Sequence, residues 1–284
     1  MRCLPRSIVF STTAALFSLS LSSHAADLKE LQDQGVIRIA VANEIPYGFT
    51  DLDGQAKGVG PEVAAHLVKA LGIDKIEWQT TNFGLLIPGL QADSFDMVAA
   101  EMAILPQRCQ QILFSEPNSS YGEGLLVAAG NPKNLHSYED FKDGAHKVAI
   151  MAGADQLEMM QALGVDESSL VTISNNADAI STVSTGRADA YAATGLTAAE
   201  LAKQSDRVEL AADFQDPVID GTAVRSWGGF TFAKNSESLR DAINEELAKF
   251  KQTPEWQEIL SRYGFSEVDQ SESSTKTTAD LCMS

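Results

Sequence analysis

The chain has 284 residues, few cysteines, few basic residues and no apolar run as long as the roughly 20 residues that a membrane-spanning helix needs. Lys and Arg total 21 against 39 Asp and Glu, which gives a net charge of −18. Binding to nucleic acids and to anionic lipid surfaces depends largely on basic side chains. We therefore exclude nucleic acid as a partner.

Motifs for nucleotide binding and for common hydrolytic chemistry are missing as well. The sequence has no G-x-S-x-G elbow, no Walker loop, no G-x-G-x-x-G after an expected strand and no H-E-x-x-H. His66, His136 and His146 stand at none of the usual metal-ligand spacings. We expect no metal and no cofactor, and a function other than catalysis.

The N-terminus is typical of a secretory signal peptide. Arg2 and Arg6 precede an uncharged apolar run over residues 7–22, and small residues lead to a cleavage site after Ala25. The alternative, a membrane anchor, is disfavoured because the run is short and rich in Ser and Thr. Cleavage would leave 19 basic residues against 39 acidic ones, a net charge of −20, and would remove Cys3.

Two cysteines, Cys109 and Cys282, would then remain in the mature chain. An even number in an exported protein suggests a disulfide, which would tie the middle of the chain to its last residues. The alternative is a pair of unreactive thiols.

Strand and helix patterns alternate along the chain, which predicts an α/β fold. The expected elements are strand 36–41, helix 61–71, strand 76–78, helix 85–90 and strand 95–100. A weak echo relates residues 87–100 to residues 180–193 and suggests two similar lobes. Apolar stripes after Ser236 and after Thr253 predict two C-terminal helices, and residues 266–284 are expected to be irregular until Cys282.

Polar and aromatic residues follow several expected strands, where open α/β sheets bind ligands. Glu44 and Tyr47 follow the first strand, Phe83 opens a short helix, and Arg108 follows the strand at 95–100. An arginine there is suited to a ligand carboxylate, through two parallel hydrogen bonds. Each residue also has an ordinary interpretation, as a solvated loop charge, a half-buried ring or a surface ion pair.

Several segments, in order along most of the mature chain, resemble the polar-amino-acid-binding proteins of ABC importers (family 3). They are VANE (41–44), GVGPEVA (58–64), LIPGLQADSFD (86–96), LPQR (105–108), FSEP (114–117), TPEW (253–256) and YGF (263–265). Within the family the chain looks most like ectoine/hydroxyectoine-binding proteins. That likeness rests on Glu44 with Tyr47, PQRC (106–109), GRADAYA (186–192) with Thr194, and KTTADLC (276–282).

The resemblance implies a type II periplasmic binding protein of two α/β lobes joined by two hinge strands, with the ligand between the lobes. Lobe 1 would comprise residues 26–122 and 227–284, and lobe 2 residues 123–226. The hinges would lie near residues 121–124 and 225–228. Both mature cysteines then fall in lobe 1. The resemblance also implies a monomer in the periplasm whose partner is the set of membrane subunits of an ABC permease.

The resemblance also implies roles for individual residues. Arg108 would hold the carboxylate of a small zwitterionic solute, Glu44 its ring nitrogens, and Tyr47 and Phe83 would present π faces to its delocalised cation. Lobe 2 would close with the segment 153–156 over the ligand. The expected ligand-binding set is Glu44, Tyr47, Phe83, Glu101, Ala103, Arg108, Ala154, Asp155, Gln156, Thr194 and Trp227.

Three positions depart from the ectoine-binding pattern. Ala103 stands where a third aromatic is expected, and Leu105 and Ala154 stand where many relatives have Thr. Either Trp227 or Tyr191 fills the gap, or the ligand is larger or chemically different.

Two other functional classes stay open. One is an enzyme of the periplasmic dehydratase type on the same fold, with Glu44 or Glu101 as its acid or base. The other is a binding protein that serves a sensor.

Overall fold

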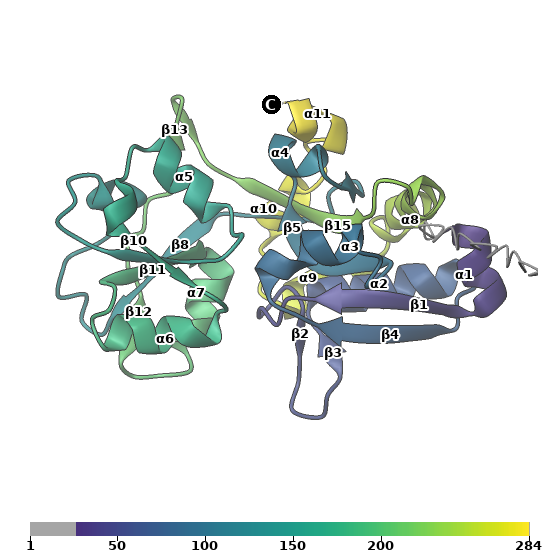
Figure 1. The fold of residues 1–284 in the computed structure, drawn as a ribbon, viewed down its shortest axis with the longest axis horizontal. Coiled ribbons are helices and arrows are strands. Elements are labelled where there is room, and N and C mark those ends of the chain that lie inside the picture. Colours follow the sequence, from purple (N-terminus) through teal and green to yellow (C-terminus); the bar gives the residue numbers. More distant parts are fainter. Residues whose placement is uncertain (1–26, 284) are drawn as a thin grey trace, which may run out of the picture.

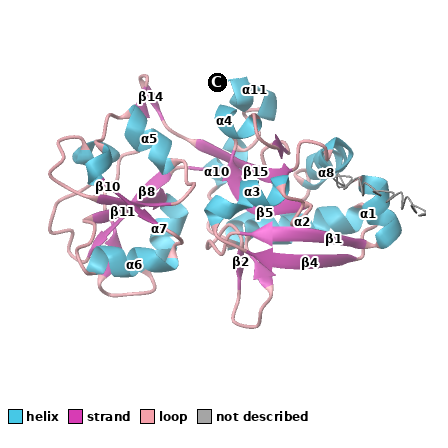
Figure 2. Ribbon diagram, in the orientation of Figure 1, coloured by secondary structure: helices cyan, strands magenta, loops and turns pink. Residues whose placement is uncertain are grey.

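The computed structural model describes residues 27–283, and the signal peptide expected over residues 1–25 lies outside the described residues. The chain forms two α/β lobes, each built on its own mixed sheet (Figure 1). Helices pack around both sheets (Figure 2). No helix in residues 27–283 is long and apolar enough to cross a membrane.

Lobe 1 contains the sheet β4-β1-β5-β15-β6, with β7 paired to β15. Its strands are β1 (Val36–Val41), β2 (Phe49–Thr50), β3 (Ala56–Lys57), β4 (Lys75–Thr80), β5 (Met97–Ala103), β6 (Leu113–Phe114), β7 (Ser119–Tyr121) and β15 (Ser226–Phe232). Its helices are α1 (Leu28–Gln34), α2 (Val59–Ala70), α3 (Leu86–Gln91), α4 (Pro106–Cys109), α8 (Glu237–Phe250), α9 (Pro254–Arg262), α10 (Glu267–Glu272) and α11 (Thr278–Met283).

Lobe 2 contains the sheet β10-β9-β11-β8-β12 and a separate hairpin. Its strands are β8 (Glu123–Ala128), β9 (Val148–Met151), β10 (Leu170–Ile173), β11 (Ala190–Thr194) and β12 (Val208–Leu210), with the hairpin strands β13 (Val218–Ile219) and β14 (Thr222–Ala223). Its α-helices are α5 (Gln156–Ala162), α6 (Ala177–Ser184) and α7 (Gly195–Ala202). Single 3₁₀ turns cover Phe83–Leu85 in lobe 1, and Tyr138–Phe141 and Glu167–Ser169 in lobe 2.

The weak repeat in the sequence corresponds to equivalent parts of the two sheets. α3 leads into β5 and α6 leads into β11, and each of these strands lies third in its sheet order. In both sheets the strand pairs parallel to one neighbour and antiparallel to the other. The carboxyl ends of β1, β5, β9 and β11 therefore supply the loops that meet between the lobes.

The chain crosses between the lobes twice, between β7 and β8 and between β14 and β15. The two crossings lie side by side, because Tyr121 pairs with Ser226 and Ser120 with Trp227 in an antiparallel ladder. They fall where the sequence predicted the hinges. The exact lobe boundaries, 26–122 with 227–284 and 123–226, stay a prediction.

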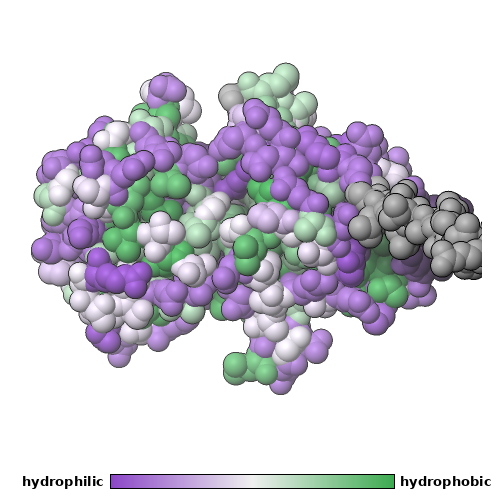
Figure 3. Space-filling view, viewed as in Figure 1, coloured by the Kyte–Doolittle hydropathy of each residue, from purple (hydrophilic) through white to green (hydrophobic). Residues whose placement is uncertain are grey.

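The apolar stripes expected after Ser236 and Thr253 are confirmed as core contacts. α8 buries Leu239, Ile243, Leu247 and Phe250, and α9 buries Trp256, Ile259 and Leu260. The face drawn in Figure 3 is largely hydrophilic, with an apolar area on lobe 2 and another at the β2–β3 hairpin, which projects from lobe 1 and carries the fully exposed Leu52.

The expectation of an irregular segment after residue 265 was wrong, since α10 and α11 both form there. Ser266 caps α10 reciprocally: its hydroxyl accepts from the Asp269 amide, and the Asp269 carboxylate accepts from the Ser266 amide. Thr277 and Asp280 make the same pair of bonds at α11. Such capping boxes stabilise short helices that lack a strong apolar stripe.

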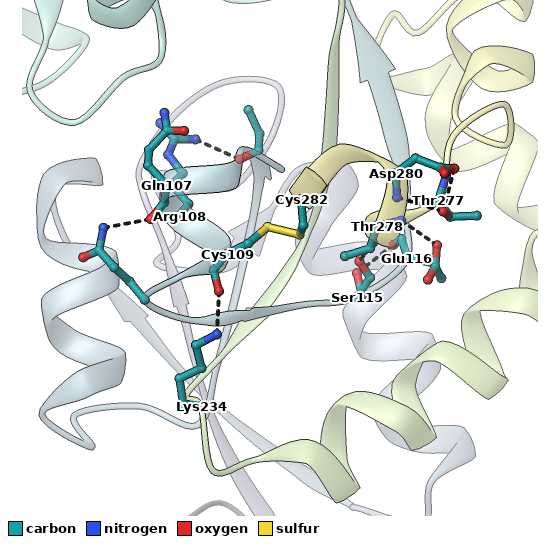
Figure 4. Close-up of a disulfide and its surroundings, with 12 residues drawn as sticks. Gln107, Arg108, Cys109, Ser115, Glu116, Lys234, Thr277, Thr278, Asp280 and Cys282 are labelled. Atoms are coloured by element: carbon teal, nitrogen blue, oxygen red, sulfur yellow. Dashed lines mark hydrogen bonds between the residues drawn. A yellow bond between two sulfur atoms is a disulfide. The ribbon is translucent and has the colours of Figure 1, made fainter. Parts of the chain in front are cut away.

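The predicted disulfide is confirmed. Cys109 at the end of α4 is bonded to Cys282 in α11, with 5.8 Å between their Cα atoms (Figure 4). Thr278 also fixes the start of α11. Its hydroxyl donates to Ser115 O, and its amide donates to the Glu116 carboxylate. The bridge joins two parts of lobe 1, as the sequence predicted.

Candidate functional site

A cavity lies between the two sheets, with about 370 Å³ of non-atom space that includes open solvent. The residues that line it are Glu44, Tyr47, Phe83, Ala100, Glu101, Ala103, Tyr121, Met151, Ala154, Asp155, Gln156, Tyr191, Ala193 and Thr194. Of the residues expected to bind ligand, the cavity brings together all except Arg108 and Trp227.

Glu44 stands in the loop after β1, where its backbone pairs with Gly48 and shapes a tight turn. The side chain is buried, and Thr197 of lobe 2 donates a hydrogen bond to its Oε1 at 2.7 Å. Burial raises the pKa of Glu44 to about 7, although hydrogen bonds from Thr197 and Asn176 oppose the rise. A carboxyl group with this pKa exchanges its proton near neutral pH.

Tyr47 reaches across the cavity from the same loop. Its hydroxyl donates to Thr194 Oγ1 at 2.8 Å, and its ring meets Tyr121 and Phe265 edge-on, with centroids 5.1 and 5.8 Å away. Packing on both sides fixes the ring direction. Burial raises the pKa of Tyr47 well above its usual value, so the phenol stays neutral.

Glu101 occupies an unusual place in β5. Its φ of 48° is in the left-handed region, and its side chain is only 2% exposed. The carboxylate accepts hydrogen bonds from Asn118 and Ser119 of lobe 1. Burial raises the pKa of Glu101 against these bonds. Because its oxygens already have partners within the lobe, the side chain positions the end of β5.

Arg108 does not line the cavity but lies beside it, nearly buried. Its Nη1 donates to Ala103 O at 3.0 Å, and its Nη2 donates to Gly153 O of lobe 2 at 2.8 Å. The guanidinium carbon lies 5.6 Å from the centroid of the Phe83 ring. The guanidinium therefore joins the lobes at the edge of the site, next to the Phe83 face.

Lobe 2 supplies residues from the starts of α5 and α7. Asp155 precedes α5 and accepts from Ser226 of the hinge strand at 3.2 Å, while Thr194 caps α7 by accepting from the Thr197 amide. Gln156 donates to Glu123 Oε2 at 2.7 Å. Both helix starts face the cavity, as the resemblance implied for the segment 153–156.

The structure adds two residues to the set expected from the sequence. Tyr191, which the sequence analysis considered only as a replacement for the third aromatic, lines the cavity, and its hydroxyl donates to Asn176. Glu123 lies buried next to the cavity, and its Oε1 has no hydrogen-bond partner. Burial and the nearby charge of Asp155 raise the pKa of Glu123 well above its usual range.

A second, mainly apolar cavity adjoins the first and is also lined by both lobes. It holds about 1530 Å³ of non-atom space, including open solvent, and Trp227 lines it. The Trp227 ring is half-buried, and its Nε1 donates to Glu272 O of α10 at 2.8 Å. Trp227 thus lies next to the first cavity and not in its wall.

Within residues 27–283, no group of three or more His, Cys, Asp or Glu side chains could hold a metal ion. The cavity walls combine buried carboxyl groups with the rings of Tyr47, Phe83 and Tyr191. Such a lining can hold a small cation by charge and by π contact, with Arg108 as the adjacent group for an anion.

Residues 37–267 match the family of bacterial extracellular solute-binding proteins, family 3. This chain belongs to that family. Its two-lobed architecture is that of the type II periplasmic binding proteins, as the sequence predicted.

One relative is a probable amino-acid ABC transporter periplasmic-binding protein, y4tE, of Sinorhizobium fredii. It is 54% identical over 286 residues, which cover 99% of this chain and 95% of the relative. Among solved structures, EhuB in complex with hydroxyectoine is 31% identical with a TM-score of 0.81, over 90% of this chain and 97% of EhuB. The ancestral amino acid-binding protein AncCDT-1, a precursor of cyclohexadienyl dehydratase, is 28% identical with a TM-score of 0.71, over 83% and 98% of the two chains.

Proposed function

We propose that this protein is the periplasmic receptor of an ABC importer, and that it captures a small zwitterionic solute with a delocalised cation and delivers it to the permease. Ectoine and hydroxyectoine are the proposed ligands. The receptor acts as a monomer, after removal of the signal peptide over residues 1–25. The carrying observation is the cavity where Glu44, Asp155 and four aromatic rings converge from both lobes.

Each part of the ligand has a matching group. The rings of Tyr47, Phe83 and Tyr191 contact the delocalised cation, and Glu44 receives its ring N–H groups. Arg108 receives the carboxylate, which takes the place of Gly153 O on the guanidinium. Thr194 offers a hydroxyl and no charge, so it does not supply a carboxylate for an α-ammonium group. The similarity to EhuB with bound hydroxyectoine supports this choice of ligand.

A thermal-shift screen tests the proposal, with ectoine, hydroxyectoine, glycine betaine, proline, arginine and glutamine. A ligand at 100 times its Kd adds about 2.7 kcal/mol of stability, which raises the Tm of a chain of this size by about 5–10 °C. The ectoines are expected to give the largest shifts. A shift with a standard amino acid, and none with either ectoine, would overturn the ligand assignment.

A second candidate function is acid–base catalysis on the same fold. It is favoured by the pKa of Glu44, about 7, because general acids and bases work best near the ambient pH. The similarity to AncCDT-1 also fits this candidate. Incubation of the protein with a bound compound, followed by mass spectrometry, distinguishes the two functions: a receptor returns the compound unchanged.

A further inference from the structure

The ligand cavity and the adjoining apolar cavity share part of their lining. Ala103 at the end of β5 and Asp155 before α5 are the residues that line both cavities. Ala103 presents only a methyl group, and its carbonyl is held by Arg108. The Asp155 carboxylate is held by Ser226 through a single bond of 3.2 Å. This shared wall, the partition, therefore includes the smallest side chain that carries a Cβ.

The second cavity has the chemistry of a binding site for an alkyl group. Leu105 and Leu281 approach it from lobe 1, and Met159 and Val224 approach it from lobe 2 and the hinge. Charged groups such as Glu158 and Lys276 stand among the lining residues that are exposed to solvent. An apolar group in this space would contact both lobes and would lose its hydration.

We propose that the ligand class of this receptor extends to zwitterions that carry an apolar chain, and that the chain passes Ala103 into the second cavity. The inference rests on the proposed function, because the charged ring must occupy the first cavity. Continuity supports it: the two cavities share a wall, and an aromatic side chain at position 103 would fill the place where they adjoin. Leu105 extends the apolar surface from that point into the second cavity.

Calorimetry with two ligands tests the proposal on the full mature chain. One ligand is ectoine, and the other is its homologue with the ring methyl replaced by a butyl group. Each methylene buried from water tightens binding by about fourfold at most. We expect the homologue to bind at least tenfold more tightly than ectoine. Weaker binding of the homologue than of ectoine would overturn the proposal, whereas binding of neither ligand would refute the proposed function itself.

Two variants test where the apolar chain of the ligand binds. Ala103→Phe closes the partition and is expected to remove the preference for the homologue. Ala223→Phe fills the second cavity from the exposed strand β14, outside the ligand cavity, and is expected to leave ectoine affinity unchanged while weakening the homologue at least tenfold. Ala129→Phe, at an exposed position elsewhere in lobe 2, is the matched control. If Ala223→Phe still preferred the homologue over ectoine as strongly as wild type does, the apolar chain of the ligand would not enter this cavity. That result would overturn the proposal.

Discussion

The Tyr47 hydroxyl and Thr194 Oγ1 lie 2.8 Å apart and join lobe 1 to lobe 2 directly beside the ligand cavity. The same tyrosine packs edge-on against Tyr121, which precedes the first hinge crossing. One side chain thus lines the cavity and also contacts the opposite lobe and the hinge. Its hydroxyl and its ring are separable by mutation.

Tyr47→Phe removes the interlobe hydrogen bond and keeps the ring. Because such a bond contributes about 1 kcal/mol, we expect roughly fivefold weaker ligand binding, measured by calorimetry. Thr194→Ser keeps a hydroxyl at the same place and is the matched control, with near-normal affinity. Wild-type affinity in Tyr47→Phe would show that this bond does not contribute to the ligand-bound state.

Arg108→Ala is expected to weaken binding of the zwitterionic ligand by well over tenfold, because a desolvated carboxylate would lose its charged partner. Arg108→Lys keeps the charge but not the planar pair of donors, so an intermediate loss is expected. Calorimetry gives both values, with Arg187→Ala at an exposed site as the control. A loss below tenfold in Arg108→Ala would contradict the carboxylate assignment.

Glu44 is expected to make stability depend on pH. Its pKa is raised from 4.5 to about 7 by burial, so between these pH values the folded chain holds a proton that the unfolded chain has lost. The free energy of unfolding therefore falls as pH rises through this window, by about 3 kcal/mol for this group, and then stays level.

Urea unfolding from pH 4.5 to 8 of wild type and Glu44→Gln checks this prediction. Glu101 and Glu123 also have raised pKa values, so the difference between the two proteins isolates Glu44. Glu44→Gln should show the shallower decline. Glu258→Gln, at an exposed position on α9, should follow wild type. Parallel curves for wild type and Glu44→Gln would rule out a titrating Glu44 in this window.

The double variant Cys109→Ser/Cys282→Ser is expected to lose about 2–5 kcal/mol of stability, because the bridge closes a loop between residues 173 positions apart. Ligand affinity should change little, since the bonds from Arg108 to Ala103 O and Gly153 O hold its guanidinium independently of the bridge. Urea unfolding with and without reductant provides an internal control: reductant should shift the wild type to the midpoint of the variant, and leave the variant unchanged. Equal midpoints without reductant would contradict a stabilising bridge.

Local patterns predicted much of the fold. The β-branched run at 36–41 is β1, and the alternation of strands and helices gives two α/β sheets. The capping boxes at Ser266 and Thr277 were readable in the sequence, but the polar composition of that segment favoured an irregular structure. Short helices there depend on caps and on the disulfide more than on apolar periodicity.

The site was harder to predict, because its contacts cross between lobes. Glu44 and Tyr47 could be found from their place after a strand, whereas Thr197 and Asn176 meet Glu44 only through the relative position of the two sheets. Glu123 escaped notice because it lies in the expected hinge segment, and nothing near it in sequence indicates that Gln156 and Tyr138 will surround it.

The strand order also bears on how the chain folds. β5 pairs with β15, so the lobe 1 sheet includes a strand that lies more than 120 residues further along the chain. The lobe 2 sheet, from β8 to β12, is continuous in sequence and has shorter loops to close. Closing long loops slows folding, so lobe 2 is able to form while lobe 1 still waits for its last strand. Lobe 1, whose sheet needs β15, would then be the last part to be completed.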